Sequence, residues 1–377
     1  MRISTVLSWL AYTSSLTQGL PFEEKRILQL SDSELITVTE SQKLSLLKRG
    51  VRFFDVTKQQ QISNTYISHR LDDPVVPVYK FPLTMAHSKE VKSLTSKIDQ
   101  KFMYEKLADF TSFYTRYYKS EYGLQAAEWL SSQIHDIVDV LPKDMVSVEH
   151  FDHNDWKQFS ILVKLKGTTS PENIVVIGSH LDSINLLFPN WLPAPGADDN
   201  GSGTVTNLEA LRLLTEHISK NGNPLNNTVE FHFYSAEEAG LLGSLDVFST
   251  YAALNKKVVA MLQQDMTGFV SDKSKEHVGV IVDYTDVGLT TFIKTVIDNY
   301  LSIPYVETEC GYACSDHGSA TKNGYPGSFV IESEFKSTSK YIHSTMDTID
   351  KISISHMAEH TKLVLGTVLE LGQWNGF

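Results

Sequence analysis

Positive charge, cysteine and long apolar runs are all scarce in this sequence. Its 377 residues include 33 lysines and arginines against 45 aspartates and glutamates, which gives a net charge of -12. This surplus of negative charge repels phosphate backbones and anionic lipid surfaces, so no nucleic-acid or membrane partner is expected. No apolar run approaches the roughly 20 residues that cross a bilayer, and the one candidate is at the extreme N-terminus. With 41% hydrophobic residues the chain can still bury a large globular core.

The N-terminus has the residue order of a secretory signal peptide. Arg2 precedes a short apolar region from Val6 to Ala11, and small and polar residues follow up to Gly19. A buried first helix is the alternative, but this succession of charged, apolar and small residues fits it poorly. We therefore predict a signal peptide over residues 1–19 and a secreted, extracellular protein.

Export changes how the two cysteines and one asparagine are interpreted. Cys310 and Cys314 enclose only three residues, and in an oxidising environment we predict that they form one small disulfide. Zinc binding by this pair is the competing interpretation, but two thiolates alone cannot close a tetrahedral site. The Asn-x-Thr sequence at Asn226 is a predicted glycosylation site.

A polar and charged segment separates the signal peptide from the remainder of the chain. It contains a helix-like stretch over residues 40–49 and an extended, proline-containing stretch over residues 72–77. We interpret residues 20–78 as a propeptide that assists folding or masks the site until it is removed. The alternative is an N-terminal arm that packs permanently on the domain. The basic pair Lys48-Arg49 is either a processing site or a solvated part of the helix.

The hydrophobic pattern beyond residue 100 is that of an α/β domain. Helical spacing over residues 110–118 and 124–140 predicts two helices, whose aromatic side chains we assign to core packing. After residue 158, short apolar runs typical of buried strands alternate with helical stretches. The predicted strands are 161–165, 174–177, 229–234, 258–262, 278–282 and 328–331.

Residue types that bind metals follow several of these strands. His180 comes just after the second strand, and Asp182 is placed to accept a hydrogen bond from its imidazole. Asp198 and Asp199 lie in a glycine-flanked turn before a helix, where a simple N-cap needs only one such residue. A lone histidine or acid has ordinary structural explanations, so each of these signals is weak by itself.

Four more residues of these types extend the set. Glu237 and Glu238 follow the third predicted strand, and packing does not explain two adjacent glutamates there. Asp265 follows the fourth strand, and His343 lies in a loop near the C-terminus. The set as a whole is far more specific than any one member.

Five sequence blocks make the chain similar to the zinc aminopeptidases of the M28 metallopeptidase family, and closely to its secreted fungal and bacterial leucine aminopeptidases. The blocks are GSHLDS at 178–183, PGADDN at 195–200, AEEAGLLGS at 236–244, QDM at 264–266 and IHSTMD at 342–347. The resemblance extends over about residues 100–377. It implies a single three-layer α/β/α catalytic domain, which we place at 79–377, with a mixed, mostly parallel central sheet of the zinc exopeptidase type.

The same resemblance implies a role for individual residues. It makes Asp198 the carboxylate that bridges two zinc ions, with a cis peptide bond between Asp198 and Asp199. The other ligands then divide into two pairs, namely His180 with Asp265 and Glu238 with His343. Glu237 becomes the general base, and none of these positions is replaced in this chain.

The residue types suit this chemistry. Zn²⁺ accepts imidazole nitrogen and carboxylate oxygen, and a shared carboxylate can hold two ions about 3.5 to 4 Å apart. Zinc lowers the pKa of bound water to near neutrality, while the second positive charge stabilises the oxyanion. Glu237 can take the proton of the attacking water and pass it to the leaving amine. We expect two Zn²⁺ per chain and a peptide substrate with a free N-terminus.

Selectivity for the N-terminal residue requires a closed pocket and groups that receive the substrate's amine, which acidic ligands near one zinc can do. A mostly apolar set of residues would suit leucine-like side chains. The candidate pocket residues are Met266, Tyr312, Phe329, Ile331, Phe335 and Ile342. Strand packing is the alternative for Phe329 and Ile331. Asp316 and His317 could support the site, although nothing local distinguishes them from other loop residues.

Three other functions remain open at this point. A related carboxypeptidase would need a basic cluster for the substrate's carboxylate, and the segments beside the motifs contain little arginine. A glutaminyl cyclase of the same architecture uses a single zinc, whereas five ligands predict two. A non-catalytic binding domain of this fold would not need Glu237. The expected assembly is a monomer.

Overall fold

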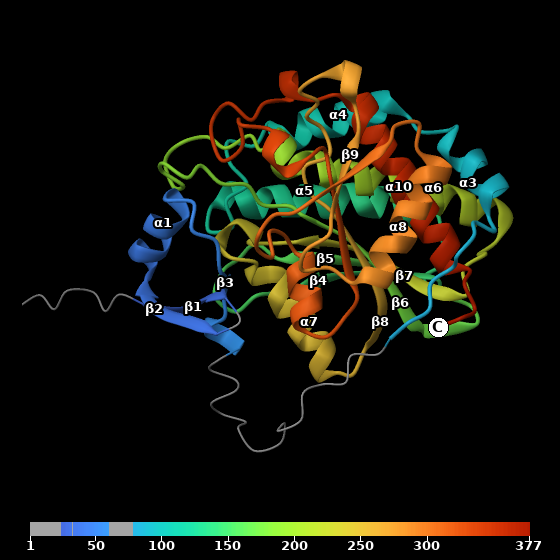
Figure 1. Ribbon diagram of the computed structural model, residues 1–377, viewed down its shortest axis with the longest axis horizontal. Coiled ribbons are helices and arrows are strands. Elements are labelled where there is room, and N and C mark those ends of the chain that lie inside the picture. The colour runs from blue at the N-terminus through green and yellow to red at the C-terminus, as the bar shows by residue number, and fades with distance from the viewer. Residues whose placement is uncertain (1–23, 32, 60–77) are drawn as a thin grey trace, which may run out of the picture.

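The computed structural model describes residues 24–31, 33–59 and 78–377, which form a small N-terminal unit and a larger body (Figure 1). The predicted signal peptide and the proline-containing stretch at 72–77 lie outside the described residues. None of the helices in the described part of the chain is long and apolar enough to span a bilayer.

The N-terminal unit, residues 24–59, has its own small sheet. Strand β1 (Lys25–Ser31) pairs antiparallel with β2 (Glu34–Thr39) on one side and β3 (Phe54–Asp55) on the other. Helix α1 (Glu40–Lys48) connects β2 to β3, and it begins with a capping box in which the side chains of Thr39 and Gln42 satisfy each other's backbone N–H groups. The helix predicted over residues 40–49 is confirmed to within one residue.

An eight-stranded sheet runs through the body in the order β10-β9-β11-β8-β6-β7-β5-β4. Its strands are β4 (Val146–Phe151), β5 (Ser160–Leu165), β6 (Ser170–His180), β7 (Asn227–Tyr234), β8 (Lys257–Gln264), β9 (Val278–Ile281), β10 (Tyr305–Thr308) and β11 (Gly327–Ile331). The neighbours β11, β8, β6 and β7 are parallel, as are β9 and β10, while the other three pairings are antiparallel. The mixed, mostly parallel sheet and all six predicted strands are confirmed. Of these eight strands only β4 and β10, at the two edges, were not predicted, and the three strands of the N-terminal unit were not predicted either.

Helices cover both faces of this sheet, which gives three layers (Figure 1). They are α3 (Ser88–Thr95), α4 (Gln100–Thr111), α5 (Glu121–Val138), α6 (Gly203–Asn221), α7 (Leu242–Ala253), α8 (Val287–Tyr300), α9 (His317–Lys322) and α10 (Ile354–Gly372). On one face α5, α6, α8 and α10 pack over strand residues such as Val175 and Ile177. On the other face α7 and α9 pack over Ile174 and Val176. This alternation follows from the pleat of a strand, and it confirms the predicted α/β/α layers.

The helix predicted over residues 110–118 is wrong for most of its length. Helix α4 ends at Thr111, and the chain continues as a loop until α5 begins. In this loop the buried Arg116 guanidinium donates hydrogen bonds to the carbonyl oxygens of Leu181 (2.9 Å) and Gly196 (2.8 Å). These tertiary bonds override the helical spacing, and they tie the loop to segments that carry the candidate ligands.

Candidate metal centre

The candidate site lies at the edge of the sheet where the central parallel strands end. His180 is the last residue of β6, and Asp265 directly follows β8. Glu237 and Glu238 begin a short turn after β7. Because parallel strands end at the same edge, these side chains converge there. His343 reaches them from the loop between β11 and α10.

Two groups of possible metal ligands share one carboxylate, that of Asp199. Asp199 Oδ1 lies 3.2 Å from His180 Nε2, which is 3.4 Å from Asp265 Oδ1. Asp199 Oδ2 lies 2.9 Å from His343 Nε2, which is 3.0 Å from Glu238 Oε2. Within each group the three ligand atoms lie within 4.8 Å of one another. Asp199 therefore presents one oxygen to each group.

The interpretation that made Asp198 the shared carboxylate is wrong by one residue. Asp198 belongs to neither group, and its Oδ1 accepts a hydrogen bond from the backbone N–H of Gly268 at 3.0 Å. The backbone explains the difference, because the N–H groups of Asp198 and Asp199 donate to the two oxygens of Asp347 at 2.9 and 3.0 Å. With the turn held in this way, it is Asp199 that faces the histidines. The cis peptide bond joins Asp199 to Asn200, not Asp198 to Asp199.

Four side-chain atoms of the ligand residues are buried without a hydrogen-bond partner, namely His180 Nδ1 and Nε2, Asp265 Oδ1 and Glu238 Oε1. Buried polar atoms ordinarily have partners, so this convergence of orphaned atoms indicates a place for a cation. Imidazole nitrogen and carboxylate oxygen are the donors that Zn²⁺ accepts in proteins, together with thiolates. The residues therefore fit zinc in both number and chemistry.

Asp182 connects the first histidine to the turn that carries the two glutamates. Its Oδ1 lies 3.3 Å from His180 Nδ1, as its place in the sequence suggested. Its two carboxylate oxygens also accept the backbone N–H groups of Glu237 and Glu238, at 3.0 and 3.3 Å. One fully buried carboxylate thus orients parts of both groups.

Non-glycine residues adopt left-handed backbone conformations around the site. The φ angles are 56° at Ala236, 57° at Met266 and 56° at His343. Ala236 precedes Glu237, Met266 follows Asp265, and His343 is itself a candidate ligand. Such conformations are uncommon for residues with a side chain and cluster at functional sites, so the surrounding contacts must hold these loops in place.

The density of negative charge shifts the pKa values of the site. Burial, together with the neighbouring charge of Asp199, raises the pKa of Glu238 to about 7. Burial alone would lower the pKa of His343, but Glu238 and Asp199 more than offset this effect and raise it to about 10. Burial also raises the pKa of Glu237 well above its usual value, with the charge of Glu238 adding to the shift. All three shifts show a site that attracts positive charge, either protons or metal ions.

A cavity of about 130 Å³ opens beside the two groups. All six predicted pocket residues line it, namely Met266, Tyr312, Phe329, Ile331, Phe335 and Ile342. The predicted disulfide between Cys310 and Cys314 is present, and its loop carries Tyr312 to the cavity wall. The lining is completed by residues that sequence reasoning missed, above all Leu47, Arg52 and Phe53 of the N-terminal unit. No local signal could have found them, because they approach the site only through tertiary structure.

The loop after the disulfide supports the ligand Asp265. The hydroxyl of Ser315 donates to Asp265 Oδ2 at 2.6 Å, and the amide of Gln263 donates to the fully buried Asp316 at 2.7 Å. His317, also fully buried, packs its ring 5.1 Å from that of Phe329 under the cavity. Asp316 and His317 therefore lie behind the site rather than in it.

The predicted glycosylation site directly precedes β7, at the opposite end of that strand from Glu237 and Glu238. The amide nitrogen of Asn226 donates to the carbonyl oxygen of Gln373 at 2.8 Å and to the side chain of Asn375 at 3.0 Å. A glycan on this nitrogen would have to replace at least one of these bonds. Glycosylation stays a prediction.

An α/β sheet whose parallel strands end in two carboxylate–histidine groups, with a further buried glutamate beside them, defines a metal-dependent hydrolase. The chain belongs to peptidase family M28, because residues 160–368 match the sequence model of that family. This confirms the resemblance found in the five sequence blocks, and membership in the family makes the protein a zinc-dependent exopeptidase.

Individual relatives support the same assignment. The chain is 59% identical over 357 residues to a probable aminopeptidase of Saccharomyces cerevisiae, with 95% of each chain covered. It is 48% identical over 360 residues to leucine aminopeptidase 1 of Coccidioides posadasii, covering 94% of this chain and 90% of the relative. Among solved structures it is similar to the LapA aminopeptidase of Legionella pneumophila, with a TM-score of 0.79, 26% identity and coverage of 93% and 99%.

Proposed function

We propose that this protein is a secreted aminopeptidase that uses two zinc ions to release leucine and other large apolar residues from the N-termini of peptides. The observation that carries the proposal is the position of Asp199, whose two oxygens face two separate three-ligand groups. A shared carboxylate is suited to two ions about 3.5 to 4 Å apart. The relatives named as aminopeptidases and leucine aminopeptidases support the substrate class.

Each zinc would be held by three residues of this chain. Bound zinc would supply an acidified water and a positive charge for the scissile carbonyl oxygen. The ligands of one ion would be His180, Asp199 and Asp265, and those of the other Asp199, Glu238 and His343. This replaces Asp198 by Asp199 in the ligand set and keeps the other four residues.

Glu237 is the residue that we assign to proton transfer. It belongs to neither ligand group, yet its Oε2 lies only 3.9 Å from His180 Nε2 and its side chain lines the cavity. Its carboxylate can accept the proton of the attacking water and return it to the leaving amine. The raised pKa of this buried group favours holding that proton between the two steps.

The cavity beside Glu237 would receive the substrate's first residue. Its apolar walls suit a leucine-like side chain, and the acidic groups at its end suit an ammonium. We assign substrate contact to Tyr312 in particular, because it lies on a loop that enters the cavity rather than on a strand.

Maturation and location are part of the same proposal. Residues 1–19 would be removed as a signal peptide and residues 20–78 as a propeptide, leaving the catalytic domain 79–377 as a monomer with a glycan at Asn226. The disulfide supports an oxidising compartment, because such bridges are rare in the cytosol.

The experiment that tests the proposal combines metal counting with a matched pair of substrates. We expect two zinc ions per chain and hydrolysis of leucinamide but not of N-acetyl-leucinamide, lost with a chelator and restored by zinc. One zinc per chain with cyclisation of N-terminal glutamine would favour the glutaminyl cyclase alternative. Cleavage of only a peptide with a free carboxylate would favour a carboxypeptidase, and no turnover by the matured two-zinc protein would favour a binding domain.

A further inference from the structure

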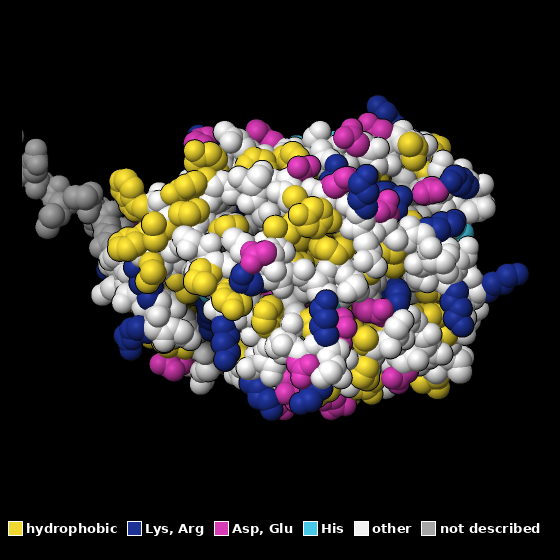
Figure 2. All heavy atoms as spheres, turned by 90° about the horizontal axis from the view of Figure 1, so that it is seen from above, with side chains coloured by type: hydrophobic (Ala, Val, Ile, Leu, Met, Phe, Trp, Pro, Cys, Tyr) yellow, Lys and Arg dark blue, Asp and Glu magenta, His cyan; other side chains and the backbone are white. Residues whose placement is uncertain are grey.

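Arg116 carries a positive charge in the interior of the body. The face of the molecule in Figure 2 shows lysine and arginine side chains at the surface, where water can hydrate their charge. Arg116, in contrast, is fully buried. None of the described carboxylates forms an ion pair with it, and the guanidinium donates to main-chain carbonyl oxygens instead. A buried charge without a partner of opposite sign is costly, so an arginine at this position needs an explanation.

This guanidinium connects the two segments that carry His180 and Asp199. Its Nε donates at 2.9 Å to the carbonyl oxygen of Leu181, which directly follows His180. Its Nη1 donates to the carbonyl oxygen of Pro195, and its Nη2 donates at 2.8 Å to that of Gly196. His180 Nε2 and Asp199 Oδ1 lie 3.2 Å apart. One side chain thus holds the main chain beside both of these candidate ligands.

The main chain at Arg116 makes the same connection a second time. Its N–H donates to Ser183 Oγ at 3.0 Å, and the Ser183 hydroxyl donates in turn to the carbonyl oxygen of Ala194 at 2.8 Å. Its carbonyl oxygen accepts the side-chain amide of Gln158 at 3.0 Å. Ser183 lies in the first of the two segments and Ala194 begins the second, so backbone and side chain of one residue hold both.

The surroundings suit a planar guanidinium rather than another cation. The guanidinium carbon of Arg116 lies 4.3 Å from the centre of the Phe110 ring, which covers its face, while its edge presents N–H donors in a fixed fork. A lysine ammonium is a single point of charge and cannot serve three carbonyl oxygens on two segments in this way. Space is tight, because a Cβ at Gly196 would lie 2.8 Å from Arg116 Nη2.

The carboxylates of the site balance the charge of Arg116 at longer range. Burial lowers the pKa of its guanidinium to about 10, against the opposing effect of Asp347, Asp182 and Asp199. The group therefore stays protonated at neutral pH. Asp347 and Asp182 are also the carboxylates that accept backbone N–H groups from the ligand-bearing turns.

We propose that Arg116 is a positioning residue of the metal centre, which fixes His180 and Asp199 at the separation that the two ligand groups require. The proposal rests on the two-zinc function proposed above. Arg116 touches none of the candidate ligand atoms and acts through the main chain of the segments that carry them. Because Asp199 belongs to both groups, displacement of its segment would disturb both.

Positioning and charge have opposite consequences for zinc binding. A positive charge near a cation site weakens cation binding, so if Arg116 acted through its charge alone, its removal would raise zinc affinity. A residue that positions the ligands raises zinc affinity in spite of its charge, so its removal lowers zinc affinity. The sign of the change therefore distinguishes the two roles.

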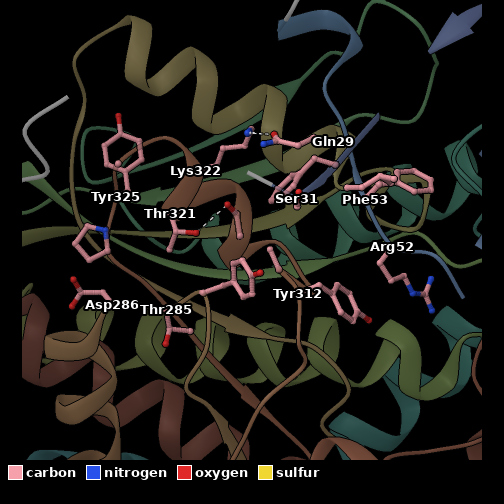
Figure 3. A pocket seen from close by; sticks show the side chains of 17 residues that line it. Gln29, Ser31, Arg52, Phe53, Thr285, Asp286, Tyr312, Thr321, Lys322 and Tyr325 are labelled. Atoms are coloured by element: carbon pink, nitrogen blue, oxygen red, sulfur yellow. Dashed lines mark hydrogen bonds between the residues drawn. The ribbon is translucent and has the colours of Figure 1, made fainter. Parts of the chain in front are cut away.

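Arg52 supplies the matched control, because it is a second arginine near the same acidic groups. It lines the metal cavity, and Figure 3 shows it next to Phe53 at the wall of a neighbouring cavity of about 380 Å³. Burial works against its charge, but nearby Tyr312, Glu238 and Glu237 more than compensate and raise its pKa. Its side chain bonds Tyr312 rather than the main chain of the two ligand segments.

The test measures zinc binding by the full chain, separately from turnover. Equilibrium dialysis against a chelator of known affinity compares Arg116→Met, Arg116→Lys and Arg52→Met with the unchanged protein, after circular dichroism has shown that each is folded. Zinc affinity should fall roughly 10- to 100-fold in both Arg116 variants, as is usual when a residue that orients metal ligands is changed. Arg52→Met should bind zinc as tightly as the unchanged protein, or more tightly.

The visible absorption of the Co²⁺-loaded protein gives a second measurement, because it depends on the geometry of the ligands. It should change in the two Arg116 variants and stay the same in Arg52→Met. Unchanged or tighter zinc binding by either Arg116 variant overturns the positioning role.

A milder variant decides the question if the Arg116 variants do not fold. Ser183→Ala removes the hydroxyl that joins the Arg116 N–H to the Ala194 carbonyl oxygen and changes the volume little. The loss of a hydrogen bond of ordinary strength corresponds to a zinc affinity about two- to tenfold lower. The control is Ser131→Ala, which removes a buried hydroxyl bonded to His150 and should leave zinc affinity unchanged. Equal zinc affinity in the two serine variants overturns the proposal.

The result is separable from the proposed enzymatic function. If zinc binding weakens as expected but the zinc-loaded protein does not hydrolyse leucinamide, the aminopeptidase function fails while the positioning role stands. If the unchanged protein hydrolyses leucinamide and the Arg116 variants bind zinc normally, the function stands and the positioning role fails.

Discussion

The catalytic body and the N-terminal unit differ in how firmly they are built. The body packs one face of its eight-stranded sheet with a cluster of more than forty buried residues, whereas the unit's cluster has three buried members. All five candidate ligands and the candidate base come from the body, while the unit contributes only a cover. The body therefore makes the site, and the unit, which we propose as part of a propeptide, lies over it. Changes in the two regions should therefore have opposite effects on activity.

The largest effect is expected from Glu237→Gln in the body. We expect kcat for leucinamide to fall by about 10²- to 10⁴-fold, because proton transfer is lost while the ligands stay in place. Steady-state kinetics and zinc analysis of the same sample measure this. Glu34→Gln, an exposed change on β2 of the unit, is the control and should leave kcat unchanged. Near-normal turnover by Glu237→Gln would remove the assignment of the base.

A pair of adjacent substitutions tests which aspartate is shared. Asp199→Asn should reduce bound zinc from two to one or none, because one amide cannot serve both groups as two carboxylate oxygens do. Asp198→Asn should retain both ions. Asp198 belongs to neither ligand group, and burial together with the adjacent Glu332 raises its pKa well above its usual value, so the uncharged amide is expected to be tolerated there. Equilibrium dialysis followed by metal analysis measures both, and the reverse pattern would restore Asp198 as the bridge.

The substitution Lys43→Met in the unit is expected to raise activity rather than lower it. This change leaves the Asp55 carboxylate buried without its partner, which costs about 3 to 5 kcal/mol, more than so small a cluster can offset. We expect faster limited proteolysis within residues 24–59 and a higher rate of leucinamide hydrolysis, with unfolding of the body unchanged. The exposed change Lys25→Met is the control. A fall in activity would break the comparison, since the unit would then support catalysis.

The smallest effect is a pH dependence of zinc affinity that involves the body alone. His343 has a pKa of about 10 in the metal-free protein and is therefore protonated at neutral pH. Zinc must displace that proton, so affinity should rise with pH, by about tenfold per pH unit for each proton released. Competition with a chelator of known affinity between pH 6 and 8 measures the slope. An affinity independent of pH would show that His343 does not bind zinc.

Much of the body could be predicted because its signals are local. Apolar runs identified six of its eight strands. The edge strands β4 and β10 were missed because none of their residues is fully buried, so their sequences contain no continuous apolar run. The blocks around His180, Glu238, Asp265 and His343 gave four of the five candidate ligands, since each block follows a strand or lies in a loop that leads to the sheet edge.

The errors have a common physical origin in contacts between distant segments. Nothing in the sequence distinguishes Asp198 from Asp199, because the choice depends on how the Asp347 carboxylate holds their backbone. The helical spacing over 110–118 was misleading because the bonds of Arg116 to distant carbonyl groups prevail. Arg52 was missed for the same reason, since only tertiary structure brings it to the cavity that Glu237 lines.

The turn that carries Glu237 and Glu238 has a consequence for how this protein can vary. Two neighbouring residues there have different tasks, and their N–H groups are pinned to the two oxygens of one carboxylate, Asp182. Deleting one residue before Glu237 would move Glu238 into the position of the base and leave Ala239 in the position of the ligand, while an insertion would move Glu237 into the ligand position and leave the base position to another residue. We therefore expect related sequences to tolerate substitutions on the outer side of this turn but to preserve its length without exception.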